Sequence, residues 1–69
     1  MKITSVVLTP KGAKTDLGNI VYTSTNKVGL FVNIKDGWII ISSRDEDNGW
    51  YMVAFHTTDT IATVIPYYK

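Results

Sequence analysis

The stretch VGLFVNIKDGWIIISS, residues 28–43, decides the fold class of this chain. Its first half alternates: apolar side chains recur at every second position, at Val28, Leu30, Val32 and Ile34. This repeat is typical of a half-buried β-strand, because successive side chains of a strand point to opposite faces. Asp36-Gly37 follows, and an Asp-Gly pair between two apolar segments is a strong hairpin signal. The sequence therefore predicts two antiparallel strands over residues 28–34 and 38–43.

The same kind of pattern extends to both sides of this hairpin. Four further strands are predicted, over residues 3–8, 20–23, 50–57 and 61–67. Turn signals separate them, at residues 9–12, 24–26, 48–49 and 58–59. The polar residues 13–18 form a loop with room for one tight turn, and no window shows helical spacing. Gly29 lies inside a strand pattern, where it predicts a bulge or a close backbone contact that bends the sheet.

These segments predict the fold of the whole chain. With 69 residues there is room for one domain, residues 1–69. Short loops favour pairing between sequence neighbours, which gives an antiparallel meander. Five or six short strands with no helix to cover a face must curl on themselves. We therefore expect an all-β fold, a small meander curled into an SH3-like barrel, with a partly open OB-like barrel as the alternative.

The amino-acid composition excludes several kinds of chemical site. The chain has no cysteine and one histidine, so disulfides, thiolate zinc sites and histidine-rich metal sites are excluded. No cofactor and no metal are expected. The longest apolar run, residues 38–41, is far too short for a membrane span, and no signal-peptide pattern follows Met1. We expect a soluble, cytoplasmic protein. The net charge of +1 argues against extensive phosphate binding without excluding it.

Apolar residues exceed what one small core can bury. The strands at residues 3–8, 38–43 and 50–57 carry apolar side chains on both faces. We expect a homo-oligomer or partner interface on the second face, formed by Trp38, Ile39, Ile41, Tyr51 and Phe55. Three alternatives stay open: sheet curvature buries both faces, the loop at residues 13–18 covers one, or a different protein or ligand occupies it.

Two polar features invite a chemical interpretation. His56 is expected on the same face as Trp50, Met52 and Ala54, and only Asp59 lies close enough in sequence to orient it. A structural, hydrogen-bonded histidine is the favoured interpretation. The acidic run at residues 45–47 lacks the spacing of a calcium loop. We expect a solvated hairpin tip there, with an acidic recognition tip for a basic partner as the alternative.

A nucleic-acid site is the main functional alternative. Small barrels bind single strands through stacking aromatic rings flanked by basic side chains. The aromatic and basic residues least needed for the core, and therefore the candidate nucleic-acid contacts, are Lys11, Lys14, Tyr67, Tyr68 and Lys69.

The favoured hypothesis is a non-enzymatic interaction protein that works as a homo-oligomer. It would act by occupying the surface of a protein partner or by sequestering a small ligand. A short chain that begins with Met1 and carries no catalytic set is typical of inhibitors of host proteins from viral or mobile-element genomes. Single-stranded or duplex nucleic-acid binding is the alternative function, and no membrane partner is expected.

Overall fold

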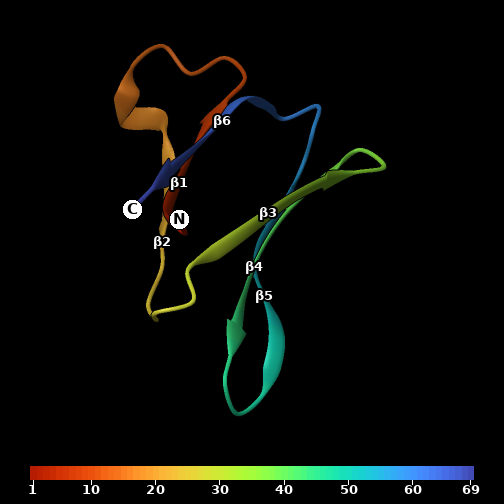
Figure 1. Cartoon of the computed structure of the whole chain (residues 1–69). Helices are drawn as coiled ribbons and strands as arrows, with labels where there is room; N and C mark the ends of the chain where they lie inside the picture. Colours follow the sequence, from red (N-terminus) through yellow and green to blue (C-terminus); the bar gives the residue numbers. More distant parts are fainter.

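The hairpin predicted from residues 28–43 is the centre of the structure (Figure 1). The computed structural model describes residues 1–69 along the backbone and every side chain except that of Asp16. Strands β3 (Leu30–Lys35) and β4 (Trp38–Asp45) pair antiparallel. The turn between them consists of Asp36 and Gly37, with φ angles of 52° and 81°. Positive φ at both central residues is the type I′ geometry, whose twist matches that of the flanking strands.

The other elements also follow the predicted segments. They are β1 (Ile3–Pro10), the 3-10 turn η1 (Asp16–Gly18), β2 (Ile20–Thr23), β5 (Gly49–Thr57) and β6 (Ile61–Tyr68). The predicted all-β fold with six strands is confirmed, and the predicted tight turn within residues 13–18 is η1. No helix in the described part of the chain is long and apolar enough to cross a membrane.

Strand β1 joins two halves of the curled sheet. Residues Val6, Val7 and Leu8 pair with β2 on one edge and with β6 on the other. The remaining three strands follow in the order β3-β4-β5, and β3 meets β1 only at the pair Leu30 and Ile3. The sheet is thus a half-barrel built from β6-β1-β2 and β3-β4-β5 (Figure 1).

The pairing departs from a pure meander in two places. Strands β2 and β3 are consecutive but both pair with β1, and β6 also pairs with β1 instead of β5. The prediction that every strand pairs with its sequence neighbour was therefore wrong at these two junctions. Local turn signals govern hairpins, whereas the pairing of the first strand with the last brings together residues about sixty positions apart.

Gly29 marks the point where the two halves meet. Its φ is +90°, and a Cβ atom built on it would lie 2.7 Å from the carbonyl oxygen of Ile3. A side chain at this position would separate β3 from β1, so glycine is required both by conformation and by space. The prediction of a close backbone contact at Gly29 is confirmed.

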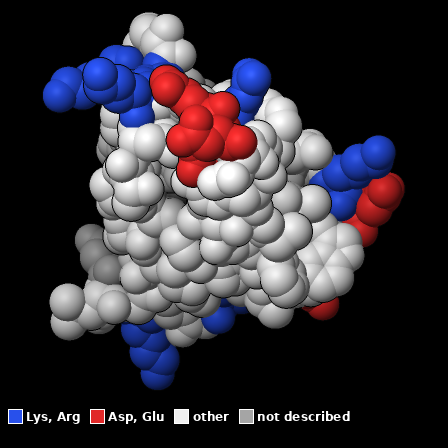
Figure 2. Space-filling model, turned by 90° about the horizontal axis from the view of Figure 1, so that it is seen from below, with Lys and Arg blue, Asp and Glu red and all other residues white. Residues whose placement is uncertain are grey.

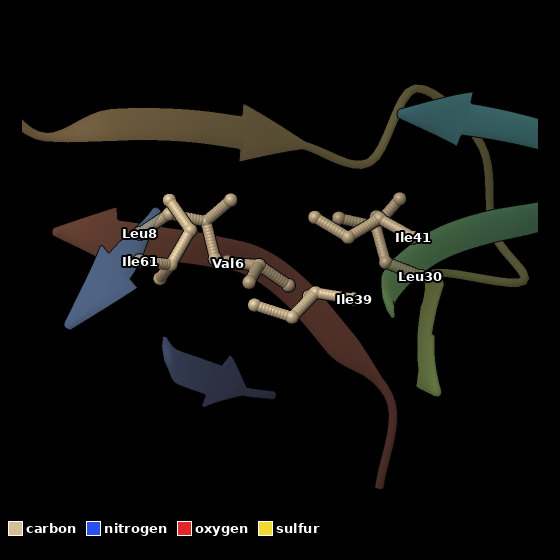
Figure 3. Packing of buried hydrophobic residues seen from close by; sticks show 6 residues of the cluster. All are labelled: Val6, Leu8, Leu30, Ile39, Ile41 and Ile61. Atoms are coloured by element: carbon tan, nitrogen blue, oxygen red, sulfur yellow. The ribbon is translucent and has the colours of Figure 1, made fainter. Parts of the chain in front are cut away.

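The core lies between the concave inner faces of the two halves (Figure 3). Six apolar residues are buried in it: Val6, Leu8, Leu30, Ile39, Ile41 and Ile61. Leu8, Val6 and Ile61 form one group from β1 and β6, and Ile41 lies beside Leu30 from the central hairpin (Figure 3). The prediction that sheet curvature could bury both faces fails, because only the concave face is covered.

The chain exposes more surface than its mass requires. Its accessible area is 4937 Å², whereas a folded monomer of 7.7 kDa typically exposes about 4,300 Å². The excess is therefore about 600 Å². The radius of gyration, 12.4 Å, likewise exceeds the value of about 11 Å expected for a compact domain of this length. The fold thus leaves surface uncovered that a closed barrel would bury.

Candidate functional site: an exposed apolar sheet face

Alternation along β4 divides its side chains between two faces. Ile39, Ile41 and Ser43 point into the core and are 3%, 0% and 2% exposed. Trp38 lies on the opposite, convex face and is 42% exposed. The prediction that Ile39 and Ile41 belong to an interface was wrong: both lie across from β3 residues of the concave face, Ile34 and Val32. The prediction for Trp38 agrees with an exposed outer position.

A β-bulge changes which residues of β5 face outward. Ile41 pairs with Ala54, but the next residue, Ser42, pairs with Met52, so Val53 is the extra residue. Phe55 and Met52 therefore lie on the convex face, across from Ile40 and Ser42.

The bulge also corrects two predictions on the concave side. His56 pairs with the inward residue Ile39, so it does not share a face with Trp50 and Met52 as predicted. Tyr51 pairs with the inward residue Ser43 and so does not share the convex face with Phe55. Nothing in the sequence around residue 53 indicates a bulge, because no glycine marks it.

The convex side of β3-β4-β5 carries a continuous apolar surface, here called the outer apolar face. Its six residues are Phe31, Trp38, Ile40, Trp50, Met52 and Phe55. All except Ile40 are at least 40% exposed. Such a concentration of large apolar side chains on one sheet face is typical of an interaction surface.

The rings of the outer apolar face form two edge-to-face pairs at opposite ends. Trp38 and Phe55 lie with ring centroids 5.5 Å apart, near the β3–β4 turn. Phe31 and Trp50 lie 4.6 Å apart at the other end, near the β4–β5 hairpin tip. Both pairs have the tilted geometry that aromatic rings favour, which stabilises the contact within each pair. Between them, Ile40 and Met52 line a shallow hollow of about 330 Å³ with Trp38 and Phe55.

No element among the described residues covers this face. The loop at residues 13–18 contacts β1 through η1, and its apolar residue Leu17 is 95% exposed. The prediction that this loop covers the second face was wrong, because the long β1–β2 connection lies at the other half of the sheet. The outer apolar face therefore stays open to solvent in a single chain.

The acidic run forms the tip of the β4–β5 hairpin. Figure 2, which views the molecule from that side, shows a compact group of acidic side chains beside Lys and Arg, with broad uncharged areas around them. Asp45 has a structural part there: its Oδ1 accepts from the backbone N–H of Asp47 at 3.0 Å. Gly49 completes the turn with a φ of 77°. The predicted hairpin tip is confirmed, and Glu46 and Asp47 are exposed on it.

The tip borders a polar hollow of about 510 Å³, and Asn26 in its lining forms hydrogen bonds to the residues around it. The amide nitrogen of Asn26 donates to Ser43 Oγ, to the Arg44 carbonyl and to Tyr51 Oη, each at 3.3 Å. Its Oδ1 accepts from the backbone N–H groups of Val28 and Gly29. The predicted interface residue Tyr51 is thus placed at the edge of this hollow and serves as an acceptor for Asn26.

His56 is held by a tyrosine and not by a carboxylate. Its Nε2 lies 2.8 Å from the hydroxyl of Tyr22, and the two rings are tilted at 51°. Both residues are half-buried on the concave side of the sheet. The expectation of a hydrogen-bonded structural histidine agrees with this contact. Among the described side chains, no cluster of three potential metal ligands occurs.

The candidate nucleic-acid residues do not form one site. Lys11 follows the end of β1 and lies beside the start of β6, where its backbone N–H donates to the Thr60 carbonyl. Tyr67, Tyr68 and Lys69 lie at the other end of the β1–β6 ladder. Lys11 and Lys14 were therefore wrongly grouped with the C-terminal residues, because the antiparallel pairing of β1 with β6 separates them.

A different basic group lies at the C-terminal end of the ladder. Lys2 and Lys69 exchange two backbone hydrogen bonds, at 2.9 and 3.2 Å, and Lys2 Nζ donates to the Lys27 carbonyl at 2.7 Å. Tyr67 and Tyr68 lie beside them and are 50% and 56% exposed. Sequence reasoning left Lys2 and Lys27 out of the site because their proximity depends on the non-local pairing of the two termini.

No family model, curated protein or solved structure matches this chain.

Proposed function

We propose that this protein is a non-enzymatic interaction module that works as a homo-oligomer, assembled through the outer apolar face. The observation that carries the proposal is the pair of ordered aromatic contacts, Trp38–Phe55 and Phe31–Trp50, on a face that the chain itself leaves open. Large aromatic residues are enriched in protein interfaces and often act as their anchors.

The small size of the core supports assembly. A domain of this length buries only about 60% of the surface of its unfolded chain. With no disulfide to add stability, association is a remaining means of burying more. Removing the exposed half of one aromatic ring from water contributes on the order of 1 kcal/mol, so four such rings matter to a marginally stable domain.

Within this proposal the assembled protein acts on a protein partner as an inhibitor, or sequesters a small polar ligand. The polar hollow beside the hairpin tip supports the second mode, because its volume of about 510 Å³ is in the usual range for small-molecule sites. The hydrogen bond between His56 Nε2 and the Tyr22 hydroxyl supports a structural role for the single histidine of the chain.

Sedimentation velocity at micromolar concentration tests the proposal. We expect the unaltered protein to sediment as an oligomer and a Trp38→Ser, Phe55→Ser double variant to sediment as a folded monomer. The matched control is Val21→Ser with Ile65→Ser, two exposed apolar residues that flank Val7 on the outside of the other half. This control should leave the oligomer intact. An unaltered protein that stays monomeric would refute the proposal.

A second candidate function, nucleic-acid binding, is favoured by the basic end of the β1–β6 ladder. Lys2 and Lys69 are paired through their backbones there, and the Lys2 side chain reaches the Lys27 carbonyl, beside the exposed Tyr67 and Tyr68. Titration with single-stranded and duplex oligonucleotides at low and moderate salt tests it, since phosphate contacts weaken steeply with salt. Absence of binding at low salt eliminates this function.

A further inference from the structure

We infer that the outer apolar face binds a second copy of this chain face to face, in an antiparallel two-fold arrangement that sets the hairpin tip of one copy against the β3–β4 turn of the other. This inference rests on the proposed homo-oligomer and specifies its geometry.

The exposed area is large enough for a dimer interface. About 600 Å² per copy is exposed in excess of a compact domain of this mass. If each copy buries an area of this size on its outer apolar face, the two together remove about 1,200 Å² from water, which is the lower limit of a standard stable interface. Two sheets stacked in this way interdigitate their side chains at a separation of about 10 Å.

The charged residues at the ends of the outer apolar face favour an antiparallel arrangement of the two stacked sheets. Asp45, Glu46 and Asp47 form the tip beyond one end of the face. If the two-fold axis ran along β4, the two tips would meet, and six acidic side chains would repel one another. An axis across the strands separates the two acidic tips and sets each of them near the β3–β4 turn of the other copy, where exposed Lys35 precedes Asp36.

The aromatic pairs fit the same direction. Trp38 and Arg44, at the two ends of the outer side of β4, are six residues and therefore about 20 Å apart. An axis across the strands midway between the levels of Ile40 and Ser42 superposes the Trp38–Phe55 pair of one copy on the Phe31–Trp50 pair of the other. Such an interface is isologous: each aromatic pair is used twice.

Single introduced cysteines test this geometry, because the chain has none of its own. Ser42 lies near the proposed axis, so Ser42→Cys should form a covalent dimer with a short bis-maleimide reagent, whose reach spans the separation of about 10 Å between stacked sheets. Glu46→Cys, on the tip, should not link to itself. Because cysteines within reach of each other in a dimer have an effective concentration near the millimolar range, Ser42→Cys should link at least about a hundredfold faster than Glu46→Cys.

A mixture of two cysteine variants provides the positive control for the predicted contact of the hairpin tip. Glu46→Cys mixed with Lys35→Cys should form the mixed dimer rapidly with the same bis-maleimide reagent, whereas each variant alone should not. Charge reversal provides an independent measurement on the same contact: Lys35→Glu and Glu46→Lys should each weaken association about tenfold, and an equal mixture of the two should restore it.

The outcomes separate the two proposals. Rapid linking of Glu46→Cys with itself would overturn the antiparallel arrangement. The arrangement would also be wrong if the protein sediments as a dimer but neither Ser42→Cys nor the mixture of Glu46→Cys and Lys35→Cys becomes linked. In both cases the proposal that the protein is a homo-oligomer would remain supported by the sedimentation measurement. If the unaltered protein and every variant sediment as monomers, the proposed function fails first and the inferred geometry fails with it.

Discussion

The hydroxyl of Tyr22 lies 2.8 Å from Nε2 of His56, and this hydrogen bond joins β2 to β5 across the interior of the half-barrel. The two strands are not neighbours in the sheet, so the contact ties the β6-β1-β2 half to the β3-β4-β5 half. It therefore stabilises the curvature that leaves the convex side of β3-β4-β5 exposed.

Replacing Tyr22 by phenylalanine should reduce stability while leaving the fold intact. The loss of a half-buried hydrogen bond is expected to lower the free energy of unfolding by about 1 kcal/mol. Urea denaturation of the two proteins at equal concentration measures it, since the stability of an associating protein depends on concentration. Tyr68→Phe is the control, because the Tyr68 side chain is 56% exposed. An equal loss in both variants would contradict a specific role for the Tyr22–His56 contact.

Replacing Ile41 by alanine should strongly lower the free energy of unfolding. Ile41 is fully buried between the two halves, and removing a buried isoleucine side chain to its Cβ costs about 2–5 kcal/mol. Ile65→Ala, at a residue that is 45% exposed, should cost less than about 1 kcal/mol. Denaturation midpoints compare the two. A tolerated Ile41→Ala would show that β4 does not present Ile41 to the core.

Substitution of Gly29 by alanine should disrupt the junction between β1 and β3. The positive φ alone costs about 1–2 kcal/mol, and the contact of 2.7 Å with Ile3 adds to it. Gly12→Ala is the matched control: its φ is also positive, at +85°, but no atom lies within 4 Å of the added Cβ. Thermal unfolding should show a clearly larger loss for Gly29→Ala, and equal losses would contradict the close approach.

Asn26→Ala should loosen the β2–β3 connection. The change removes an acceptor for two backbone N–H groups and a donor to three oxygens. Leaving such partly buried groups unpaired should cost about 2–3 kcal/mol. Asn48→Ala, which removes one exposed contact at 3.4 Å to Asp45, should cost less than about 0.5 kcal/mol. Hydrogen exchange at Val28 and Gly29 should rise in the first variant only.

Local signals in the sequence predicted the strands and turns of this fold. The Asp36-Gly37 turn and the alternation of residues 28–34 act over a few residues, so their consequences can be derived without the rest of the chain. The pairing of β1 with β6 depends on how the whole sheet curls, and no local pattern encodes it.

The candidate site was predicted only in part. Trp38 and Phe55 were expected on an interface and lie on the outer apolar face, whereas Ile39 and Ile41 lie in the core. Choosing between the two apolar faces of β4 requires knowing which one meets β1. The bulge at Val53 then moves every later residue of β5 to the other face, and the sequence carries no mark of it.

The tryptophans offer the most direct test of the outer apolar face. Trp38 and Trp50 are the two tryptophans of the chain, and both lie on that face, 42% and 60% exposed. Their fluorescence, recorded across a dilution series together with acrylamide quenching, therefore reports on this surface alone. If copies of the chain cover the face, emission should shift to shorter wavelength and quenching should weaken as concentration rises. Emission and quenching that stay constant from the most dilute to the most concentrated sample would contradict the account.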